Sequence, residues 1–201
     1  RAYYEKAGIL VARPAKGSSC TLAVSAKGGN NAENHNHNDI GSYAVALGKC
    51  TMVGDQGGPF SYPGDYFSAE APEKYKIKGS FGHPVPVVDG KTQSSGAKAS
   101  AIVLKKEFTD VKDLLCIDYT SAYSTPSLDK LVRTFVYDRQ GKGSFTVGDE
   151  FTANAPIRFE TAITTQANWK IIDDTHLLLT TGTEQMTVTI EASGKVAFTS
   201  E

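Results

Sequence analysis

The sequence predicts an all-β fold, a large and distorted antiparallel β-sandwich with long loops at one edge. Three observations support this prediction. Helical periodicity is nearly absent, and runs rich in Val, Ile, Thr, Tyr and Phe recur along the chain. Turn-forming Gly, Pro, Asn, Asp and Ser interrupt these runs about every ten residues, as in sandwiches and barrels. The 201 residues fit one such unit, so we expect a single domain over 1–201.

The expected strands follow one another after a short helical turn within Ala2–Gly8. Polar and apolar residues alternate in Ser144–Val147 and Thr187–Ile190, which is typical of strands with one buried face. The pair Asp89–Gly90 predicts a hairpin turn. The predicted strands are Ile9–Arg13, Cys20–Ser25, Gly41–Leu47, Thr51–Val53, Val85–Val88, Ala99–Lys105, Leu114–Tyr119, Leu131–Asp138, Gly143–Phe151, Ile157–Thr164, Trp169–Asp173, His176–Thr181, Met186–Glu191 and Val196–Thr199.

Two segments do not have the pattern of strands. Gly28–Asn38 is too polar and too rich in Asn and Gly for the interior of a sheet. Asp55–Glu73 combines Pro and Gly with several aromatic residues. Loops of this length in a compact domain are usually functional or disordered, and aromatic residues among Gly and Pro favour an ordered binding surface.

Composition excludes several classes of function. Hydrophobic residues make up 40% and charged residues 21% of the chain, as in ordinary soluble globular proteins. The formal net charge is −1 and no basic run exceeds Lys105–Lys106, so we expect no nucleic-acid partner. No apolar run reaches the roughly 20 residues that span a membrane, so we expect no membrane partner.

The cysteines and the N-terminus give less information about the class of protein. Cys20, Cys50 and Cys116 are odd in number and far apart, which excludes a full disulfide framework and favours three buried small hydrophobic residues. The chain begins at Arg1 and shows no signal peptide, which predicts a mature form or an excised piece.

The strongest chemical signal is the motif Asn34-His35-Asn36-His37-Asn38-Asp39. In an extended segment, side chains two residues apart project to the same side, so His35 and His37 can share one site. A solvated Asn/His loop explains the motif equally well when it is taken alone. Asp55, at the end of a β-like run, and His83, at the start of another, change that balance. Two His and one Asp from strand ends form a plausible three-ligand zinc site with an open fourth position.

The order HNHND, GSYAVALGK, VGDQGG and SFGHPVPVVDGKTQ resembles the heparinase II/III-like family of polysaccharide lyases. Later segments resemble the family too, among them Asp118–Tyr123, Leu131–Tyr137 and Val147–Phe151. The resemblance covers roughly residues 5–160. It implies that the sandwich is of the super-sandwich type and forms the C-terminal region of a two-part enzyme.

The resemblance also implies roles for individual residues. His37, Asp55 and His83 match the zinc ligands, and the zinc organises the loop more than it acts as a Lewis acid. His35 matches a catalytic histidine at the substrate cleft, which helps to neutralise the uronate carboxylate or moves a proton. We expect Asn36 and Asn38 to orient this loop and contribute to substrate binding.

Each further candidate for substrate binding has a second, purely structural interpretation. Tyr62, Tyr66 and the neighbouring Phe67 form either a sugar-stacking platform or an anchor for the long loop. Arg133 binds a substrate sulfate or carboxylate, or it is a strand residue with a salt-bridge partner.

Other residues with notable side chains are not expected to bind substrate or metal. Tyr119 and Tyr123 are core or cleft-wall residues, Trp169 is expected in the core, and His176 is not expected to be a metal ligand.

The function implied by the resemblance is cleavage of uronic-acid-containing glycans, such as heparin, heparan sulfate or alginate, by β-elimination. An N-terminal (α/α) toroid of the same enzyme supplies further catalytic groups in this family, and it is absent from 1–201. We therefore expect little or no lyase activity from the chain alone, and a periplasmic or secreted location. The alternatives are a non-catalytic carbohydrate-binding sandwich that keeps zinc for stability and a structural or adhesive extracellular β domain.

Overall fold

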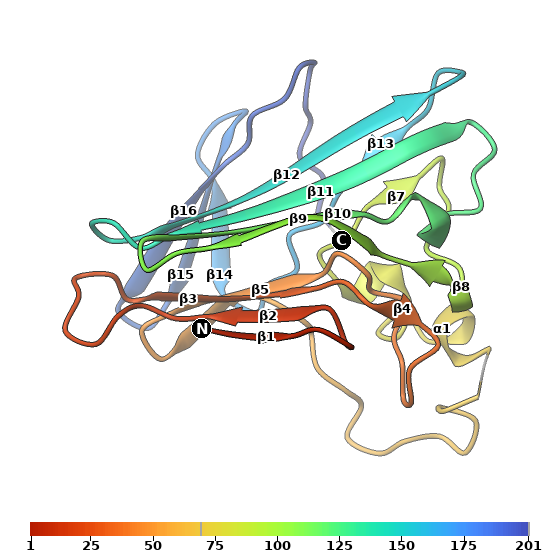
Figure 1. The fold of residues 1–201 in the computed structure, drawn as a ribbon, viewed down its shortest axis with the longest axis horizontal. Coiled ribbons are helices and arrows are strands. Elements are labelled where there is room, and N and C mark those ends of the chain that lie inside the picture. Colours follow the sequence, from red (N-terminus) through yellow and green to blue (C-terminus); the bar gives the residue numbers. More distant parts are fainter. Residues whose placement is uncertain (69, 201) are drawn as a thin grey trace.

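The computed structural model describes residues 1–68 and 70–200, and its regular secondary structure is almost entirely antiparallel strand (Figure 1). Two large sheets lie face to face. The first contains, in spatial order, β1 (Ala2–Tyr4), β2 (Ile9–Ala12), β3 (Leu22–Lys27), β5 (Tyr43–Leu47) and β6 (Cys50–Val53). The second contains β12 (Ser144–Ala153), β11 (Leu128–Asp138), β10 (Lys112–Asp118) and β9 (Ile102–Phe108). The predicted all-β sandwich is confirmed.

Smaller elements surround the two large sheets. A three-stranded sheet contains β14 (Asn168–Ile171), β15 (His176–Thr181) and β16 (Glu184–Thr189), and two-stranded sheets pair β13 (Phe159–Glu160) with β7 (Val87–Val88) and β4 (Asn30–Asn31) with β8 (Gly96–Ser100). The short helices are α1 (Ala71–Lys74) and the 3-10 turns Ser80–Gly82 and Thr120–Ala122. In the described part of the chain, no helix is long and apolar enough to span a membrane.

The core fills the space between the large sheets because their strands alternate. In β11 the inward residues are Leu131, Arg133, Phe135 and Tyr137, each at most 1% exposed, and β3 alternates in the same way. Full burial of one such apolar side chain contributes about 1.5–3 kcal/mol to the free energy of unfolding. Arg133 is the charged exception in this row of buried side chains.

Several sequence expectations need correction. Within the segment expected to hold a short turn, Ala2–Tyr4 instead form strand β1, where Tyr3 packs on Phe108 with ring centroids 5.5 Å apart, and the turn is confined to residues 5–8. The expected strand Ala99–Lys105 is interrupted at Ala101, where the chain leaves β8 and enters β9.

The C-terminal part also differs from expectation. No strand forms over Val196–Thr199, and only Phe159–Glu160 of Ile157–Thr164 is a strand. Trp169 is 51% exposed, not buried, because it lies on the edge strand β14, whose residues are all exposed. The hairpin at Asp89–Gly90 is present, with positive φ at both residues and a β-bridge between Val88 and Lys91.

One end of the sandwich carries most of the irregular chain. The loop between β3 and β5, the long segment between β6 and β7, α1 and the β4–β8 pair gather there (Figure 1). The β3–β5 loop and the β6–β7 segment contain the two loops that the sequence marked as functional.

All three cysteines are free, with Cys20 buried and Cys50 and Cys116 half-buried.

Candidate metal centre

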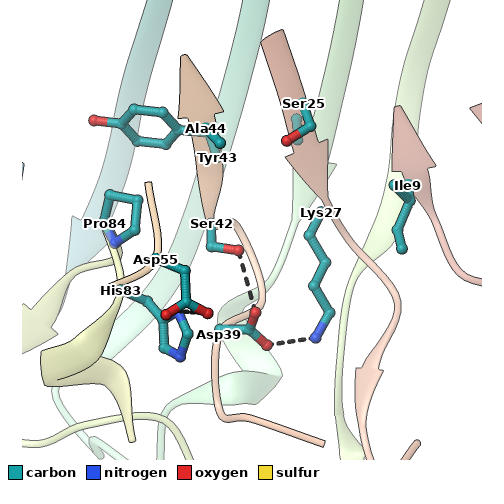
Figure 2. Close-up of a pocket in the computed structure, with 11 residues that line it drawn as sticks. Ile9, Ser25, Lys27, Asp39, Ser42, Tyr43, Ala44, Asp55, His83 and Pro84 are labelled. Atoms are coloured by element: carbon teal, nitrogen blue, oxygen red, sulfur yellow. Dashed lines mark hydrogen bonds and ion pairs between the residues drawn. The ribbon is translucent and has the colours of Figure 1, made fainter. Parts of the chain in front are cut away.

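Three side chains from distant parts of the sequence meet at the irregular end of the sandwich. Nδ1 of His37 lies 3.1 Å from Nε2 of His83 and 3.9 Å from Oδ2 of Asp55. Nδ1 of His83 lies 3.7 Å from the same carboxylate oxygen. Figure 2 shows Asp55 directly beside His83. The structure therefore brings together the three residues that the sequence predicted as metal ligands.

Each member of this triad (His37, Asp55 and His83) is held by its own local structure. Asp55 follows β6, where Gly54 exchanges two hydrogen bonds with Thr164: its N–H donates to the Thr164 carbonyl at 3.0 Å, and its carbonyl accepts from the Thr164 hydroxyl at 2.7 Å. His83 ends a 3-10 turn, and its N–H donates to the Ser80 carbonyl at 3.1 Å.

The loop that carries His37 is fixed by buried polar side chains on either side. The Asn36 amide donates to the His37 carbonyl at 2.5 Å. Asn38 is 2% exposed, and its amide donates to the Gln93 carbonyl at 3.1 Å and to the Ser95 hydroxyl at 3.0 Å. Because the Asn38 side chain is used inside the protein, it orients the loop and is not available for substrate.

Gln93 is the centre of this polar network and was not identified as a functional residue from the sequence. Its side chain is buried and both accepts from the Ile40 N–H at 2.9 Å and donates to the Ile40 carbonyl at 2.6 Å. Its backbone N–H donates to the Ser80 hydroxyl, which in turn donates to the Asn38 carbonyl, both at 3.0 Å. Gln93 thus links the loop of His37 to the turn of His83.

The electrostatic setting favours a neutral imidazole at His37. Burial lowers the pKa of His37 first, and the neighbouring charge of His83 lowers it further, against opposing effects of Asp39 and Asp55. A metal binds the deprotonated form of imidazole, so a lowered pKa at His37 reduces the competition from protons.

The triad fits a small divalent cation. Its candidate ligand atoms all lie within 4.8 Å of one another. In a tetrahedral site with bonds of about 2.0–2.1 Å, ligand atoms stand about 3.3 Å apart, close to the His37–His83 spacing. His83 is buried, His37 is half-buried and Asp55 is exposed, so the group is open on one side, as a site with a free coordination position requires. His176 is not a member of this group and pairs with Asp173 at 2.8 Å.

A pocket of about 210 Å³ opens beside the triad on the outer side of the first large sheet (Figure 2). Asp55, His83 and Pro84 form one wall, and the ion pair of Lys27 with Asp39 forms the other. The Ser42 hydroxyl donates to the second Asp39 oxygen at 3.3 Å. The pocket thus joins charged groups of both signs to the open side of the triad.

His35 lies on the exposed side of the same loop, in a left-handed conformation with φ of +57°. Its ring stacks on Phe67, with centroids 4.3 Å apart and planes inclined by 27°. Phe67 belongs to a cluster with Tyr62 and Tyr66, at centroid distances of 5.1 Å and 5.2 Å. The two segments that the sequence marked as functional therefore contact each other through aromatic stacking.

The two tyrosines of the aromatic cluster differ: one is exposed as a sugar-stacking platform requires, and the other is buried as an anchor of the loop requires. Tyr62 is 59% exposed and is free to contact a ligand, whereas Tyr66 is 2% exposed and anchors the loop. Buried Lys78 holds Tyr66 in place, because its ammonium donates to the Tyr66 carbonyl at 2.7 Å and lies 5.3 Å from the Phe67 ring centroid. Burial lowers the pKa of Lys78.

Arg133 is not placed to bind a substrate. It is 1% exposed, and all five N–H groups of its guanidinium are used inside the protein. Nε and Nη2 donate to the two carboxylate oxygens of Asp149 at 2.8 Å and 2.6 Å, and Nη2 also contacts the Thr161 hydroxyl at 3.3 Å. Nη1 donates to two backbone carbonyls, those of Gly41 and Pro84, both at 2.8 Å. The interpretation as a strand residue with a salt-bridge partner is the one the structure supports.

Comparison with known proteins reveals a shared fold. No model of a known protein family matches the sequence, and no curated protein matches it either. Among solved structures, a mutant of heparan sulfate lyase HepC from Pedobacter heparinus superposes with a TM-score of 0.60 at 19% sequence identity. The match covers 80% of this chain and 24% of the lyase, so the chain spans less than two thirds of that protein. The likeness shows that the two share their sandwich fold.

Proposed function

We propose that the chain is the β-sandwich part of a polysaccharide lyase that cleaves acidic glycans beside a uronic acid, with zinc bound by His37, Asp55 and His83. The observation that carries the proposal is the convergence of these three side chains, with an exposed histidine, His35, two residues before the ligand His37. The fold shared with a heparan sulfate lyase supports it independently.

The chemistry of the reaction explains why such a site is useful. In β-elimination a base removes the proton on C5 of the uronate, the C4–O4 bond breaks, a C4–C5 double bond forms and an acid protonates the leaving O4. The C5 proton is weakly acidic while the neighbouring carboxylate is ionised, so positive charge or hydrogen-bond donors must stabilise the developing carbanion. His35 is the group of this chain that we assign to the carboxylate or to the proton transfer.

Zinc, when bound, supplies positive charge and fixes the loop that carries His35. His37 is two residues from His35, so whatever fixes His37 also limits the positions open to His35. Phe67 restricts His35 from the other side by stacking. The site thus orients one exposed imidazole from both sides, and the remaining acid and base belong in our proposal to an (α/α) toroid of the same enzyme.

A test compares the isolated chain with the sandwich joined to its toroid, using heparin, heparan sulfate and alginate as substrates. Formation of unsaturated uronate is followed by ultraviolet absorbance. We expect turnover from the joined protein, a loss of about 100-fold or more in H35A, and little or none from the isolated chain. Robust turnover by the isolated chain would contradict a site shared between two domains.

A second candidate function is glycan binding without cleavage, and the exposed aromatic residues favour it. Tyr62 and Phe67 are 59% and 49% exposed and adjacent, as expected of a platform on which sugars stack. Binding of the same glycans by the joined protein, with no unsaturated product, would support this alternative. Both functions place the protein outside the cytoplasm, in the periplasm or secreted, where such polymers occur.

A further inference from the structure

We propose that Arg133 is a positioning residue for the metal centre, because one of its guanidinium nitrogens joins the two chain segments that deliver His37 and His83. This inference rests on the metal site of the proposed function. Nη1 donates one N–H to the Gly41 carbonyl and the other to the Pro84 carbonyl, both at 2.8 Å. Gly41 ends the loop that carries His37, and Pro84 directly follows His83.

The guanidinium is itself held rigidly from the opposite sheet. Arg133 lies on β11 and faces Asp149 of β12 in the register of the pair. The bidentate contact fixes the plane of the guanidinium, and the Tyr119 hydroxyl donates to Asp149 at 3.0 Å. With its plane fixed, the two N–H groups of Nη1 point in fixed directions, so the carbonyls of Gly41 and Pro84 are held at a fixed separation.

The contact at Gly41 is close, which makes the position sensitive. Gly41 has a φ of +85°, a left-handed conformation that favours glycine. A Cβ there would lie 3.3 Å from a ring carbon of Tyr119 and 3.6 Å from Cδ of Arg133. A side chain at this position would crowd the Tyr119 ring and would have to adopt the left-handed conformation, so glycine suits the path by which the loop enters β5.

Lysine cannot reproduce this arrangement. Its ammonium can form an ion pair with Asp149, but it lacks the planar fork that reaches a carboxylate and two carbonyls in fixed directions. The variant R133K therefore keeps the charge of the buried pair and removes the bridge. A second variant, R133M with D149L, removes both charges with side chains of similar volume, a change that often leaves stability nearly unaltered.

The chain supplies a matched control in Arg139, which directly follows the last residue of β11. Arg139 also pairs with a buried aspartate, Asp113, and donates to a backbone carbonyl, that of Arg13, at 2.9 Å. Its guanidinium also lies on a tyrosine ring, 4.6 Å from the Tyr137 centroid. The two arginines are six positions apart along an extended chain, about 20 Å, so R139K removes an equivalent anchor far from the triad.

The experiment measures zinc affinity of the whole chain by competition with a chromophoric chelator, together with hydrogen exchange of the metal-free protein. We expect R133K and the double variant to bind zinc about tenfold more weakly or worse, the range for groups that orient metal ligands. We also expect faster exchange in 34–42 and 80–86 without metal. R139K should match the wild type in both measurements, whatever its thermal stability.

The outcomes separate this inference from the proposed function. Absence of zinc binding by the wild type would refute the metal site, while the exchange data would still test the positioning role. Wild-type affinity and exchange in R133K and in the double variant would overturn the role of Arg133. An equal loss in R139K would also overturn it, because the effect would then be general destabilisation.

Discussion

The regular centre of the sandwich and the irregular end that carries the triad are held together in different ways. In the centre, ladders of backbone hydrogen bonds and apolar residues such as Phe135 and Leu131 fix the structure. At the irregular end, buried polar side chains take this role, above all Gln93 and the guanidinium of Arg133, which reaches there from strand β11. Apolar burial is non-directional, whereas hydrogen bonds set direction and distance. We therefore expect changes in the centre to alter stability and changes at the end to alter the site.

The largest effect should come from F135A in the centre. Phe135 is 1% exposed, and truncation of a buried phenylalanine costs about 3–5 kcal/mol in the free energy of unfolding. Urea denaturation measures this loss. Zinc affinity of the folded variant, measured at low temperature, should stay within about twofold of the wild type, and a large loss of affinity would show that the two regions are coupled.

The next largest effect should come from H83A at the irregular end. Loss of a metal ligand should weaken zinc binding by more than about 100-fold, beyond the usual effect of residues that only orient ligands. Calorimetric titration measures the affinity. H176A is the matched control, because His176 pairs with Asp173 away from the triad, and it should bind zinc as the wild type does.

A smaller effect, on both stability and zinc affinity, is expected for Q93L. The variant leaves the buried N–H and carbonyl of Ile40 without the partners they now have, at a cost of about 1–3 kcal/mol. It should also weaken zinc binding by roughly tenfold, because Ile40, at the end of the loop that carries His37, loses its side-chain hydrogen bonds to Gln93. Denaturation and zinc titration of the same sample provide the test. Q140L, at an exposed position, should change stability by less than about 0.5 kcal/mol.

The smallest effect on stability should come from F67A, which removes an exposed ring that stacks on His35. The expected loss is about 1 kcal/mol or less. The ring protons of His35 should lose the upfield shift caused by the phenyl ring, as measured by NMR. F81A is the control, since Phe81 is similarly exposed at 51% but does not stack on a histidine. An unchanged His35 spectrum in F67A would contradict the stacked arrangement.

The sequence predicted the centre of the molecule well and the irregular end only in outline. Alternation in segments such as Ser144–Val147 reports a buried face, so most strands were found within a few residues. It does not report which neighbour covers a side chain, so Trp169 was placed in the core although it lies on an exposed edge strand. The short Val196–Thr199 pattern likewise lacks a partner strand in the structure.

At the irregular end, residue type and order predicted the triad because few other side chains bind metals. The same signals could not separate a buried polar residue from an exposed one. Arg133 and Asn38 were therefore kept among the candidates for substrate binding, although both are buried and internally bonded. Gln93 is the last residue of the segment SFGHPVPVVDGKTQ, which the resemblance singled out, but its role depends on contacts with residues more than 50 positions away.

The proposed site requires one metal ion held jointly by His37, Asp55 and His83. The most direct test is anomalous scattering measured at the zinc edge on crystals of the chain grown with zinc. We predict one strong peak within bonding distance of all three side chains, about 2.0–2.2 Å from each ligand atom. A zinc peak elsewhere, or three side chains surrounded only by ordinary solvent, would contradict it.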